Sequence, residues 1–511
     1  MGRIAILSKT RSLEDLSALL DEARLQGKTI VHCHGVFDLL HVGHIRHLEE
    51  AKALGDVLIV TVTPDCYVNK GPHRPAFQQD LRIESIAALD AVDYVAVNRW
   101  ETAENAIKIL KPDIYVKGPD YGQGRPDLTG GLSKEEDAVE SVGGRLEITN
   151  TVQYSSTSLL NRYVPLFPPD MNGWLGEFRD EYTSGEILDY LERLRELRVV
   201  VIGEAIIDEY VYCNALGKSS KEPILAMQFD SKEKHLGGSL AIANHLADFC
   251  GEVRLVTYLG TIHPHERFIR ENLKPNVQPE FVMKSGSSTI VKRRFIEQYQ
   301  FSKLFEVYEM NDAFLTPHEH AQLSEILAKE LAHGDVAMVA DFGHGLLSPE
   351  AIRMVESRAR FLAVNTQINA ANLGYHTISR YRKADYISIQ EKEIRVDRRD
   401  PRGKLNPLVE SLSRELQCPS VMVTQGNKGT LLYQQGQGFF ESPSLATKVV
   451  DRVGAGDALF ALTAPCVAMG VPADVVGFIG NLAGAQAVMT VGNSRALDRV
   501  QLLRSVESLL K

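Results

Sequence analysis

The sequence predicts an α/β protein built from two domains, and three observations support this prediction. The chain has 511 residues, which is more than one ordinary hydrophobic core accommodates. Apolar segments with strand and helix spacing alternate in two separate parts of it, as is typical of parallel sheets covered by helices. In each part, a glycine-containing turn leads into a helix. We therefore expect domains at residues 1–163 and 197–511, joined by a linker and connecting helix at residues 164–196.

The first domain shows the alternation most clearly between residues 28 and 163. Ligands of parallel sheets bind at the carboxyl ends of the strands, so the turn after the first strand is an expected site. The expected strands cover residues 28–33, 57–62, 94–97 and 114–116, and the expected helices cover residues 45–54, 81–89 and 103–110.

A break in the pattern separates the two domains. Residues 164–180 lose the alternation and contain three prolines, which favours a linker. Residues 185–197 have the spacing of an amphipathic helix. The second domain begins with a strand at residues 198–203, continues with strand patterns to about residue 307, and ends in strand–helix repeats.

The turn after the first strand contains two histidines, in the sequence Gly35-Val36-Phe37-Asp38-Leu39-Leu40-His41-Val42-Gly43-His44. His41 and His44 are three positions apart, so both rings can lie at the entry to the following helix. The first N–H groups and the positive dipole end of that helix attract phosphates. Such a site suits the direct attack of a phosphate ester on a nucleoside triphosphate, which requires mainly positioning and charge stabilisation. Gly35 permits a tight turn and close approach of a phosphate.

This turn resembles the GxFDxxHxGH motif of the HxGH nucleotidyltransferases. Four further segments resemble, in the same order, the adenylyltransferase half of the bifunctional heptose kinase/adenylyltransferases: residues 54–60, 70–75, 116–121 and 155–158. The resemblance covers about residues 28–163 and implies a Rossmann-like fold, with Asp38 organising the turn and Arg82 adding positive charge. The catalytic residues that it implies are His41, His44 and Lys70. The nucleotide-binding residues that it implies are Gly35, Phe37, Asp38, Lys117, Ser156, Thr157 and Ser158.

Two other interpretations of this turn exist. A short HxGH motif can be an ordinary helix start with two surface histidines. Alternatively, Cys33 could form a metal site with His32, His34, His41 and His44. Strand alternation places His32 and His34 on one face and Cys33 on the other, which disfavours a compact metal site.

A second glycine-rich turn lies near the end of the chain, in the sequence Asp451-Arg452-Val453-Gly454-Ala455-Gly456-Asp457. An apolar run at residues 458–462 follows it. Glycines before a helix expose consecutive N–H groups, which form an anion hole for a phosphoryl group in transfer. Asp457 lies at the expected helix start, where its carboxylate can accept the proton of an attacking hydroxyl.

This second turn resembles the DTxGAGD motif of the ribokinase-like (PfkB) carbohydrate kinases, with Arg452 where threonine is common. Segments at residues 202–208, 236–244, 341–347 and 423–429 resemble other motifs of that family in the same order. The resemblance implies a ribokinase-like fold with a small β lid and a catalytic Asp457. The nucleotide and anion-hole residues that it implies are Thr424, Gly426, Gly454, Ala455, Gly456 and Asn481. The sugar-binding residues that it implies are Asp208, Gly237, Gly238 and Asn244.

Two motifs depart from the kinase pattern. The family's NxxE motif is Gln390-Glu391-Lys392-Glu393 in this chain, which leaves Glu393 as the candidate magnesium ligand. The usual DPK strand end is Asn365-Thr366-Gln367. Both changes concern the handling of magnesium and nucleotide, so a domain that binds a ligand without catalysis is an alternative to an active kinase.

The composition is that of a globular protein, with 44% hydrophobic and 24% charged residues. A formal net charge of −10 argues against a general nucleic-acid binder. No apolar run reaches the roughly 20 residues of a membrane span, and no signal-peptide layout is present. The six cysteines are scattered without a CxxC pair, which favours a reducing cytoplasm. We therefore expect a cytoplasmic enzyme without membrane or nucleic-acid partners.

Together, the two resemblances imply a bifunctional enzyme that uses ATP in its kinase half and ATP or CTP in its transferase half. Its expected product is a nucleotide-activated, heptose-like sugar, linked to ADP or CDP, for surface glycan synthesis. Both transfers from a triphosphate require Mg²⁺. The halves stand in reverse order to the resembled heptose enzymes, and the lid suggests a homo-oligomer such as a dimer. The alternative is a nucleotidyltransferase similar to alditol-phosphate cytidylyltransferases, with an inactive kinase-like sensor or oligomerisation domain.

Overall fold

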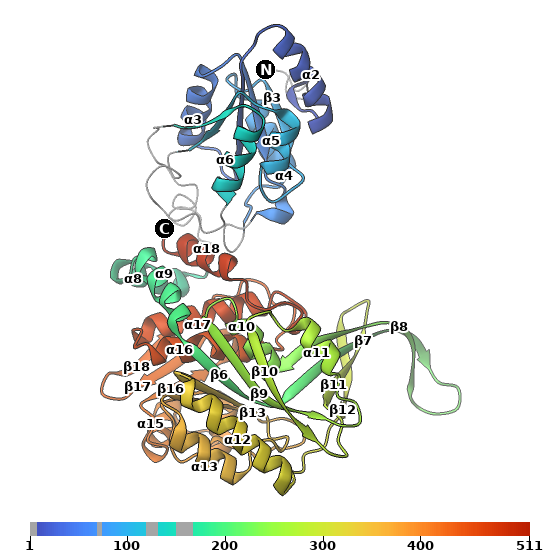
Figure 1. Cartoon of the computed structure of the whole chain (residues 1–511), viewed down its shortest axis with the longest axis vertical. Coiled ribbons are helices and arrows are strands. Elements are labelled where there is room, and N and C mark those ends of the chain that lie inside the picture. The colour runs from blue at the N-terminus through green and yellow to red at the C-terminus, as the bar shows by residue number, and fades with distance from the viewer. Residues whose placement is uncertain (1–7, 69–73, 119–130, 150–166) are drawn as a thin grey trace. The chain divides into compact units, whose positions relative to one another are not determined.

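The computed structural model describes residues 8–68, 74–118, 131–149 and 167–511. The chain forms two compact units, one made of Met1–Ser184 with Leu503–Lys511 and the other of Gly185–Leu502. Each unit contains its own helix-flanked sheet (Figure 1). The predicted α/β class is confirmed. The sequence did not indicate that the last residues of the chain group with the first unit.

A five-stranded parallel sheet forms the centre of the first unit, in the order β3-β2-β1-β4-β5. The chain moves from β1 to one side through β2 and β3, and then returns to the other side of β1 for β4 and β5. In such sheets, the change of direction opens a ligand-binding crevice at the carboxyl ends of the strands on either side of it, here β1 and β4. The strands are β1 (Ile30–Gly35), β2 (Val57–Val62), β3 (Tyr94–Val97), β4 (Ile114–Lys117) and β5 (Arg145–Ile148).

Helices cover both faces of this sheet. They are α2 (Leu13–Leu25), α3 (Val42–Ala53), α4 (Gln79–Ala87), α5 (Glu104–Leu110) and α6 (Gly131–Ser141), with a 3-10 turn η1 (Asp65–Tyr67). On one face, Leu48 of α3 packs in a core with Val31 of β1. On the other, Leu16 of α2 packs in a core with Ile30 of β1. Because successive strand residues enter opposite cores, β2 and β3 are apolar at almost every position.

Three helices of the first unit differ from the prediction. Helix α2 precedes the first predicted strand, and α6 follows the last predicted strand of this domain; neither helix is predicted. Helix α8 (Pro169–Glu181) occupies most of the segment for which the sequence predicts an irregular linker. Its prolines stand at the helix start, where proline is tolerated because that N–H has no helical partner. Leu175 and Phe178 are buried, so apolar packing stabilises the helix.

The second unit contains a nine-stranded sheet in the order β10-β9-β6-β13-β14-β15-β16-β17-β18. Its strands run parallel from β10 to β16, and the antiparallel strands β17 and β18 complete one edge. The bounds are β6 (Arg198–Gly203), β9 (Glu252–Gly260), β10 (Val277–Lys284), β13 (Val336–Asp341), β14 (Leu362–Thr366), β15 (Tyr386–Gln390), β16 (Ser420–Thr424), β17 (Thr430–Gln434) and β18 (Gly438–Ser442).

The helices of this unit include α16 and α17, which are apolar on nearly all sides. Every residue from Ala458 to Cys466 of α16 is buried. None of the described helices of the chain is both long and apolar enough to span a bilayer. The bounds are α9 (Ser184–Arg193), α10 (Ser239–Leu246), α11 (Glu266–Asn272), α12 (Pro317–His333), α13 (Pro349–Arg358), α14 (Glu391–Asp397), α15 (Leu405–Glu415), α16 (Ala455–Ala468) and α17 (Ala473–Ala487). The last helix, α18 (Arg499–Leu509), begins in this unit, but its residues from Leu503 on group with the first unit.

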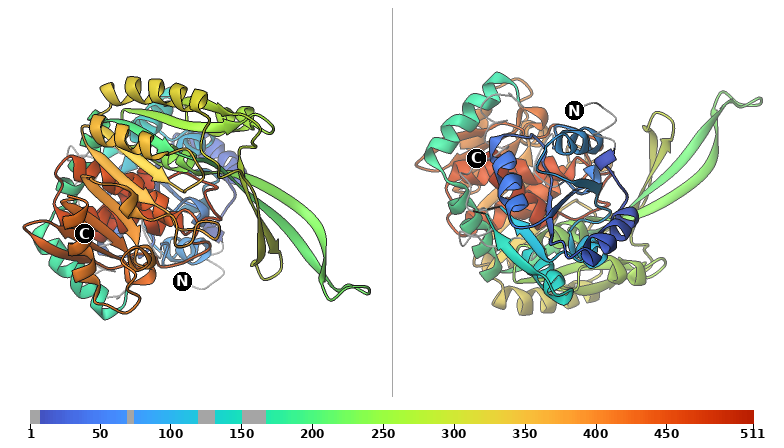
Figure 2. Two further views of the ribbon diagram at one scale, coloured as in Figure 1. Left: turned by 90° about the horizontal axis from the view of Figure 1, so that it is seen from below. Right: turned by 90° about the horizontal axis from the view of Figure 1, so that it is seen from above.

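A four-stranded sheet, in the order β12-β11-β7-β8, forms a lid on this unit. Its strands are β7 (Ala205–Lys218), β8 (Leu225–Gly238), β11 (Ile290–Glu297) and β12 (Ser302–Glu309). Strands β7 and β8 are the longest, and their joined ends project as a hairpin (Figure 2). The outer part of the hairpin exposes Leu216, Ile224, Leu225 and Phe229. The predicted small β lid is confirmed.

A buried carboxylate holds the turn that follows β13. Glu204 lies between β6 and β7 and is 0% exposed. It accepts hydrogen bonds from the backbone N–H groups of Phe342, His344 and Leu346 at 3.0, 3.1 and 3.3 Å. Because β13 lies near the middle of the sheet, Glu204 fixes the backbone at the edge where ligands of this fold class bind.

Glu204→Ala removes all three acceptors and leaves buried N–H groups without partners. Each such group costs roughly 1–3 kcal/mol, so we expect the free energy of unfolding of this unit to fall by at least about 3 kcal/mol. Urea denaturation followed by circular dichroism measures the loss. Thr316→Ala is the control, because Thr316 caps α12 through a single bond from Glu319 N–H and its loss is expected to cost about 1 kcal/mol. Equal losses for the two variants would contradict the role of Glu204.

Candidate active sites

The two histidines of the first motif lie side by side at the start of α3. Their rings are stacked, with centroids 3.9 Å apart and an interplanar angle of 25°. His41 is the N-cap residue of α3, and its Nδ1 accepts a hydrogen bond from the N–H of Gly43 at 3.1 Å. Because Nδ1 is an acceptor, a neutral His41 ring has its proton on Nε2. The ring thus has an N–H donor of the kind that binds a phosphate oxygen.

A strained residue precedes the histidines in the loop between β1 and α3. Phe37 has a φ of 48°, which is uncommon for a residue other than glycine. Its ring meets the ring of His44 edge-on, with centroids 5.4 Å apart. A Cβ at Gly35 would lie 3.1 Å from the Phe37 ring. Gly35 therefore makes room for Phe37, which packs against His44. The backbone of Gly35 is not left-handed. The packing of Phe37, rather than a tight turn, therefore explains why residue 35 is glycine.

Asp38 fastens this loop to the residues before α4. Its Oδ1 accepts hydrogen bonds from the N–H groups of Ala76 and Phe77 at 2.6 and 3.1 Å. Its Oδ2 accepts a hydrogen bond from Nη1 of Arg74 at 2.7 Å. The side chains of this ion pair are 0% and 1% exposed. The structure thus brings Arg74, which the sequence did not single out, to the loop that carries the histidines.

Arg82 is a second buried arginine in this region, and its guanidinium bonds only within the fold. It donates hydrogen bonds to the carbonyl oxygens of Phe77, Val36 and Thr63 and to the carboxylate of Asp65, at distances from 2.5 to 3.0 Å. Its charge is paired with Asp65. Arg82 therefore stabilises the loop and α4, which differs from the expectation that it adds charge to the site.

Buried histidines line the strands of this unit. His32 Nε2 and His34 Nδ1 both lie within hydrogen-bond distance of Thr61 Oγ1, at 2.7 and 2.9 Å. Burial lowers the pKa of each histidine to about 3, so both rings are neutral at pH 7; His32 is fully buried and His34 is half-buried. Among the described residues, no group of three or more His, Cys, Asp or Glu side chains is arranged to hold a metal ion.

Lys117 lies at the carboxyl end of β4, beside the expected crevice. Its Nζ forms a buried ion pair with Glu135 of α6 at 2.7 Å. Glu135 also accepts hydrogen bonds from the hydroxyl of Tyr115 and the N–H of Ala103. The charge of Lys117 is thereby partly offset within the fold. The other expected residues of this site, Lys70, Ser156, Thr157 and Ser158, lie outside the described residues.

The second motif forms the start of α16. Gly454 is the N-cap residue with a φ of 86°, and a Cβ there would lie 1.9 Å from Oδ1 of Asn493. Glycine is therefore required. Ala455, Gly456 and Asp457 form the first turn, whose N–H groups have no acceptor within the helix. Apart from its chain neighbours and the backbone of its own helix, no atom lies within 4 Å of a Cβ position on Gly456, so space for an anion exists on this side of the helix start.

Asp457 occupies this first turn and keeps part of its surface exposed. Burial of the carboxyl group, together with the charges of Asp208 and Glu393, raises the pKa of Asp457 to about 7, and Lys292 opposes this rise. Four ionisable groups from distant parts of the sequence therefore lie within electrostatic reach of one another. A carboxylate with a pKa near 7 suits proton transfer at neutral pH.

Asp208 of β7 pairs with Arg294 of β11 at 2.5 Å, and both side chains are buried. A Cβ at Gly237 would lie 2.3 Å from Oδ2 of Asp208, so the glycine makes room for the carboxylate. Gly238 has a φ of 56° and is the N-cap residue of α10. The antiparallel pairing of β7 with β8 thus places Asp208, Gly237 and Gly238 next to one another.

Lys292 is a functional candidate that the sequence did not single out as a site residue. It lies on β11 and is 5% exposed. Its Nζ lies 5.4 Å from the ring centroid of Tyr308 and 5.7 Å from that of Phe342. Burial lowers the pKa of Lys292, and Asp208 counteracts part of that effect. The alternation of β11 places Lys292 and Arg294 on the same face of the strand, which is the sequence signal that could have identified it.

The lid is fixed to the anion-hole turn through Asp451. Lys303 of β12 donates a hydrogen bond to Oδ1 of Asp451 at 2.6 Å. The hydroxyl of Tyr210 on β7 donates one to Oδ2 at 2.9 Å. Asp451 also accepts a hydrogen bond from the N–H of Val453 within the turn. Two lid strands therefore hold the turn that carries Asp457, a connection between residues too distant in sequence to predict.

Two expected ligand-binding asparagines bond to the protein itself. Asn481 Nδ2 donates a hydrogen bond to Thr430 Oγ1 at 2.9 Å and so joins α17 to β17. Asn244 donates a hydrogen bond to the carbonyl oxygen of Asn272 and accepts one from the N–H of Lys274, both at 2.9 Å. Both side-chain amides thus serve to connect elements of the fold.

The expected nucleotide and magnesium residues lie at the carboxyl ends of β15 and β16. Thr424 ends β16, and Gly426, with a φ of 62°, begins the short turn η5 (Gly426–Lys428). The two oxygens of Glu393 accept hydrogen bonds from the N–H groups of Ile368 and Gln390 at 3.0 and 2.7 Å. Burial raises the pKa of Glu393 to about 7.

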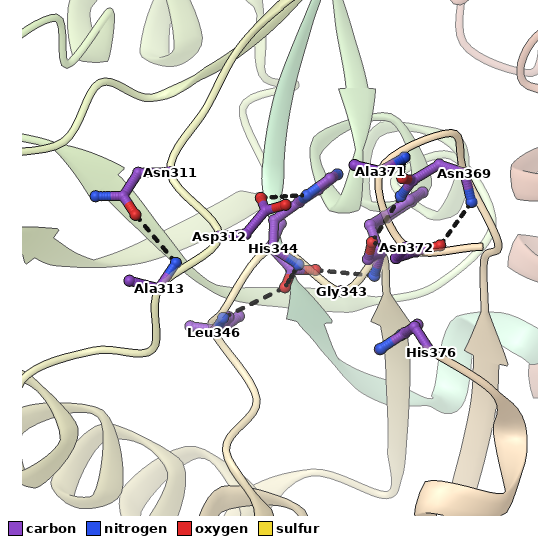
Figure 3. A network of polar contacts seen from close by, with 12 residues as sticks. Asn311, Asp312, Ala313, Gly343, His344, Leu346, Asn369, Ala371, Asn372 and His376 are labelled. Atoms are coloured by element: carbon purple, nitrogen blue, oxygen red, sulfur yellow. Dashed lines mark hydrogen bonds and ion pairs between the residues drawn. The ribbon is translucent and has the colours of Figure 1, made fainter. Parts of the chain in front are cut away.

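The segment after β14, which departs from the kinase pattern, binds the turn after β13 (Figure 3). The side chains of Asn369 and Asn372 both donate hydrogen bonds to the carbonyl oxygen of Phe342 at 3.0 Å. His376 lies 3.1 Å from the carboxylate of Asp341, the last residue of β13. The residues of this segment that differ from the kinase pattern therefore have a structural role at the carboxyl edge of the sheet.

Two family models match separate parts of the chain. The cytidylyltransferase-like model matches residues 32–162, and the pfkB family carbohydrate kinase model matches residues 196–499. In the solved structures, phosphofructokinase-2 from Escherichia coli in complex with potassium has a TM-score of 0.51 and 15% sequence identity, and covers 62% of this chain and 100% of its own. At that identity, the likeness shows the fold alone.

Curated relatives match a shorter part of the chain. The bifunctional protein HldE of Syntrophotalea carbinolica is 41% identical over 163 residues, which are 30% of this chain and 32% of that protein. The protein of the same name from Pseudomonas entomophila is 42% identical over 151 residues, which are 29% of this chain and 30% of that protein. The match therefore spans less than a third of the length of these relatives.

The predicted combination of a nucleotidyltransferase part with a carbohydrate-kinase part is confirmed at the level of these families. The kinase model extends over residues 196–499, which is more than half of the 511 residues. The chain belongs to the pfkB family of carbohydrate kinases.

Proposed function

We propose that this chain is a bifunctional enzyme that phosphorylates a sugar or sugar phosphate and joins a nucleotide to a sugar 1-phosphate. The observation that carries the proposal is that two helix starts each hold the group that its chemistry requires. These groups are the stacked His41 and His44 at α3 and Asp457 at α16. By resemblance to the bifunctional heptose enzymes, the product is an ADP- or CDP-linked, heptose-like sugar for surface glycans. We propose that the two halves of this chain stand in reverse order to those of the heptose enzymes.

In the first reaction, a hydroxyl of the acceptor attacks the γ-phosphorus of ATP, and ADP leaves. Asp457 accepts the proton of that hydroxyl, for which a pKa raised to about 7 is well matched. The N–H groups of the first turn of α16 stabilise the charge on the phosphoryl group in transfer. Asp208, adjacent to Gly237, binds hydroxyls of the acceptor.

In the second reaction, an oxygen of the sugar 1-phosphate attacks the α-phosphorus of the nucleoside triphosphate, and pyrophosphate leaves. No side chain forms a covalent intermediate. The stacked rings of His41 and His44 donate hydrogen bonds to the phosphate oxygens, and the dipole of α3 adds to the stabilisation. His41 is held for this role by the bond from Gly43 N–H to its Nδ1.

Mg²⁺ fits the acidic side of the kinase site. Asp457 and Glu393 are close enough for the charge of Glu393 to raise the pKa of Asp457. Each Glu393 oxygen accepts one hydrogen bond from the backbone, so each oxygen keeps a second lone pair that can bind a metal ion. Mg²⁺ commonly takes one or two carboxylates together with water and the phosphates of the substrate. When bound with ATP, the ion would neutralise charge on the β- and γ-phosphates.

A second candidate function is a nucleotidyltransferase whose kinase-like unit binds a ligand without catalysis. Gln390 and the segment Asn365-Thr366-Gln367 favour this candidate, because they replace residues of the usual magnesium and nucleotide motifs. The two candidates differ in whether ATP-dependent phosphorylation of any sugar occurs. A sugar and sugar-phosphate panel, analysed by mass spectrometry, distinguishes them.

Asp457→Asn keeps the shape of the side chain and removes the proton acceptor. We expect the kinase kcat/KM to fall by about 100-fold or more, while pyrophosphate release at the first site is unchanged. In the unsubstituted chain, Asp457 must be ionised to accept the proton, and its pKa is about 7. The kinase rate should therefore rise as the pH increases towards 7 and level off above it.

Lys292→Met should shift this rise to higher pH, because Lys292 lowers the pKa of Asp457. Rates measured from pH 5 to 9 on the acceptor found in the panel provide the test. A rate that is independent of pH below 7, or an Asp457→Asn variant with full kinase activity, would exclude Asp457 as the base.

His44→Ala removes one of the two stacked donors at the first site. We expect the rate of pyrophosphate release to fall by about 10²–10³-fold, as for the loss of one donor to a developing anion. The assay uses ATP and CTP separately, each with a panel of sugar 1-phosphates. His47→Gln is the control, since His47 lies one turn further along α3 and bonds Thr149 instead. A similar loss in both variants would indicate damage to α3 rather than to catalysis.

The exposed apolar residues of the lid hairpin support a homo-oligomer formed through the lid. Phe229 is 60% exposed and Leu225 is 53% exposed. We expect the unsubstituted chain to be dimeric and the double variant Leu225→Asp, Phe229→Asp to be monomeric in light-scattering chromatography. Tyr375→Asp is the control, because Tyr375 is 92% exposed and lies outside the hairpin. A monomeric unsubstituted chain would rule out this assembly.

A further inference from the structure

We propose that Arg74 is a phosphate-binding residue of the nucleotidyl-transfer site and that Asp38 positions it. The inference rests on the proposed function, because it assigns a protein partner to one of the phosphates in that reaction. None of the sequence motifs assigns a role to Arg74.

Two buried arginines near the histidine loop differ in how their donors are used. The Nε, Nη1 and Nη2 atoms of Arg82 all donate hydrogen bonds to protein acceptors. Arg74 donates only through Nη1, to Oδ2 of Asp38. Within the parts of the chain that the structure describes, Nε and Nη2 of Arg74 are buried and have no hydrogen-bond partner. The Arg74 side chain is 1% exposed.

Buried donors without acceptors cost free energy unless a ligand accepts their hydrogen bonds. A buried guanidinium N–H without an acceptor loses its hydration and gains nothing in return. The Nε–H and one N–H of Nη2 point in the same direction from one edge of the planar guanidinium. That edge matches two oxygens of a phosphate or carboxylate in a bidentate pair. The proposed substrates carry phosphates, so a phosphate is the group that this edge would bind.

Asp38 does not accept hydrogen bonds from Nε and Nη2 of Arg74, because its oxygens are engaged elsewhere. Its Oδ1 accepts hydrogen bonds from the N–H groups of Ala76 and Phe77, and its Oδ2 is bonded to Nη1. These bonds fix the carboxylate, which in turn fixes the guanidinium plane. Asp38 also offsets the charge of Arg74, which makes the burial of an arginine tolerable before a ligand arrives.

The position of this pair points to the transferase site. Asp38 is three residues before His41 in the loop from β1 to α3, and both belong to the turn at the carboxyl end of β1. Phe37, between Gly35 and Asp38, packs against His44. Arg74 is therefore bonded to the loop that also sets the two histidines.

The test uses the full chain and titration calorimetry with two probes, inorganic pyrophosphate for the end of a triphosphate and glucose 1-phosphate for the acceptor. His44→Ala identifies the binding event that belongs to the first site. Arg74→Met should weaken that event by about 10- to 100-fold for at least one probe, the loss expected for charge-assisted hydrogen bonds. Arg74→Lys should give a smaller loss, because lysine keeps the charge without the two-pronged edge.

Arg99→Met is the matched control, since Arg99 is exposed and pairs with Glu14 at the surface of the same unit. Loss for pyrophosphate alone would assign Arg74 to the triphosphate, and loss for glucose 1-phosphate alone would assign it to the acceptor. Unchanged affinity of Arg74→Met and Arg74→Lys for both probes, or no binding of either probe to the unsubstituted chain, would overturn the inference. Melting curves show whether each variant is folded. If Arg74→Met is not folded, Arg74→Lys provides the test, because its lysine remains a partner for Asp38.

Nucleotide-sugar formation by the unsubstituted chain is measured separately. If it occurs and Arg74→Met leaves kcat and KM unchanged, the inference fails and the proposed function stands. If it does not occur but Arg74→Met still weakens binding of a probe, the function fails and the anion site stands.

Discussion

Both candidate sites depend on a helix whose first N–H groups are left available to a ligand. The first N–H groups of any α-helix have no acceptor within the helix, and side chains usually satisfy some of them. In α12, Thr316 and Glu319 form a complete capping box, so side chains already accept hydrogen bonds from the N–H groups at that helix start. By contrast, α16 begins at Gly454 without a side-chain cap, and α3 begins at His41, whose side chain accepts a hydrogen bond from the N–H of Gly43. The sequence chemistry at these two points keeps the helix starts able to bind anions.

The charges around the two sites follow different rules, and the difference fits the two reactions. Near α16, burial and the charges of Asp208 and Glu393 raise the pKa of Asp457, whereas Lys292 lowers it. Proton acceptance at neutral pH requires such a balance. Near α3, His32 and His34 are neutral, and the buried cation Arg74 is paired with Asp38. Nucleotidyl transfer requires donors to phosphate and no proton acceptor of that kind.

Local sequence signals predicted the elements and the two glycine-rich turns, because both depend on neighbouring residues. Strands β2 and β3 have the predicted bounds 57–62 and 94–97. Helix α8 was not predicted, since prolines at a helix start and prolines in a linker look the same in sequence. Lys303 and Arg74 were not predicted as partners of Asp451 and Asp38, because strand pairing and loop packing decide which distant residues meet. The pattern of residues near a motif carries no information about such pairs.

The departures from the kinase motifs bear on whether the second unit catalyses, and their contacts favour catalysis. Asn365, Asn369 and Asn372 donate hydrogen bonds to the backbone carbonyl groups of Ser388 and Phe342, so the changed segment is an ordered part of the sheet edge. Burial, together with the charges of Asp208 and Glu393, raises the pKa of Asp457 to about 7, which destabilises the folded state at neutral pH relative to an ordinary aspartate. In a kinase, this shift provides a proton acceptor at neutral pH. We therefore propose that the charge arrangement around Asp457 supports catalysis despite the altered residues at Gln390 and Asn365.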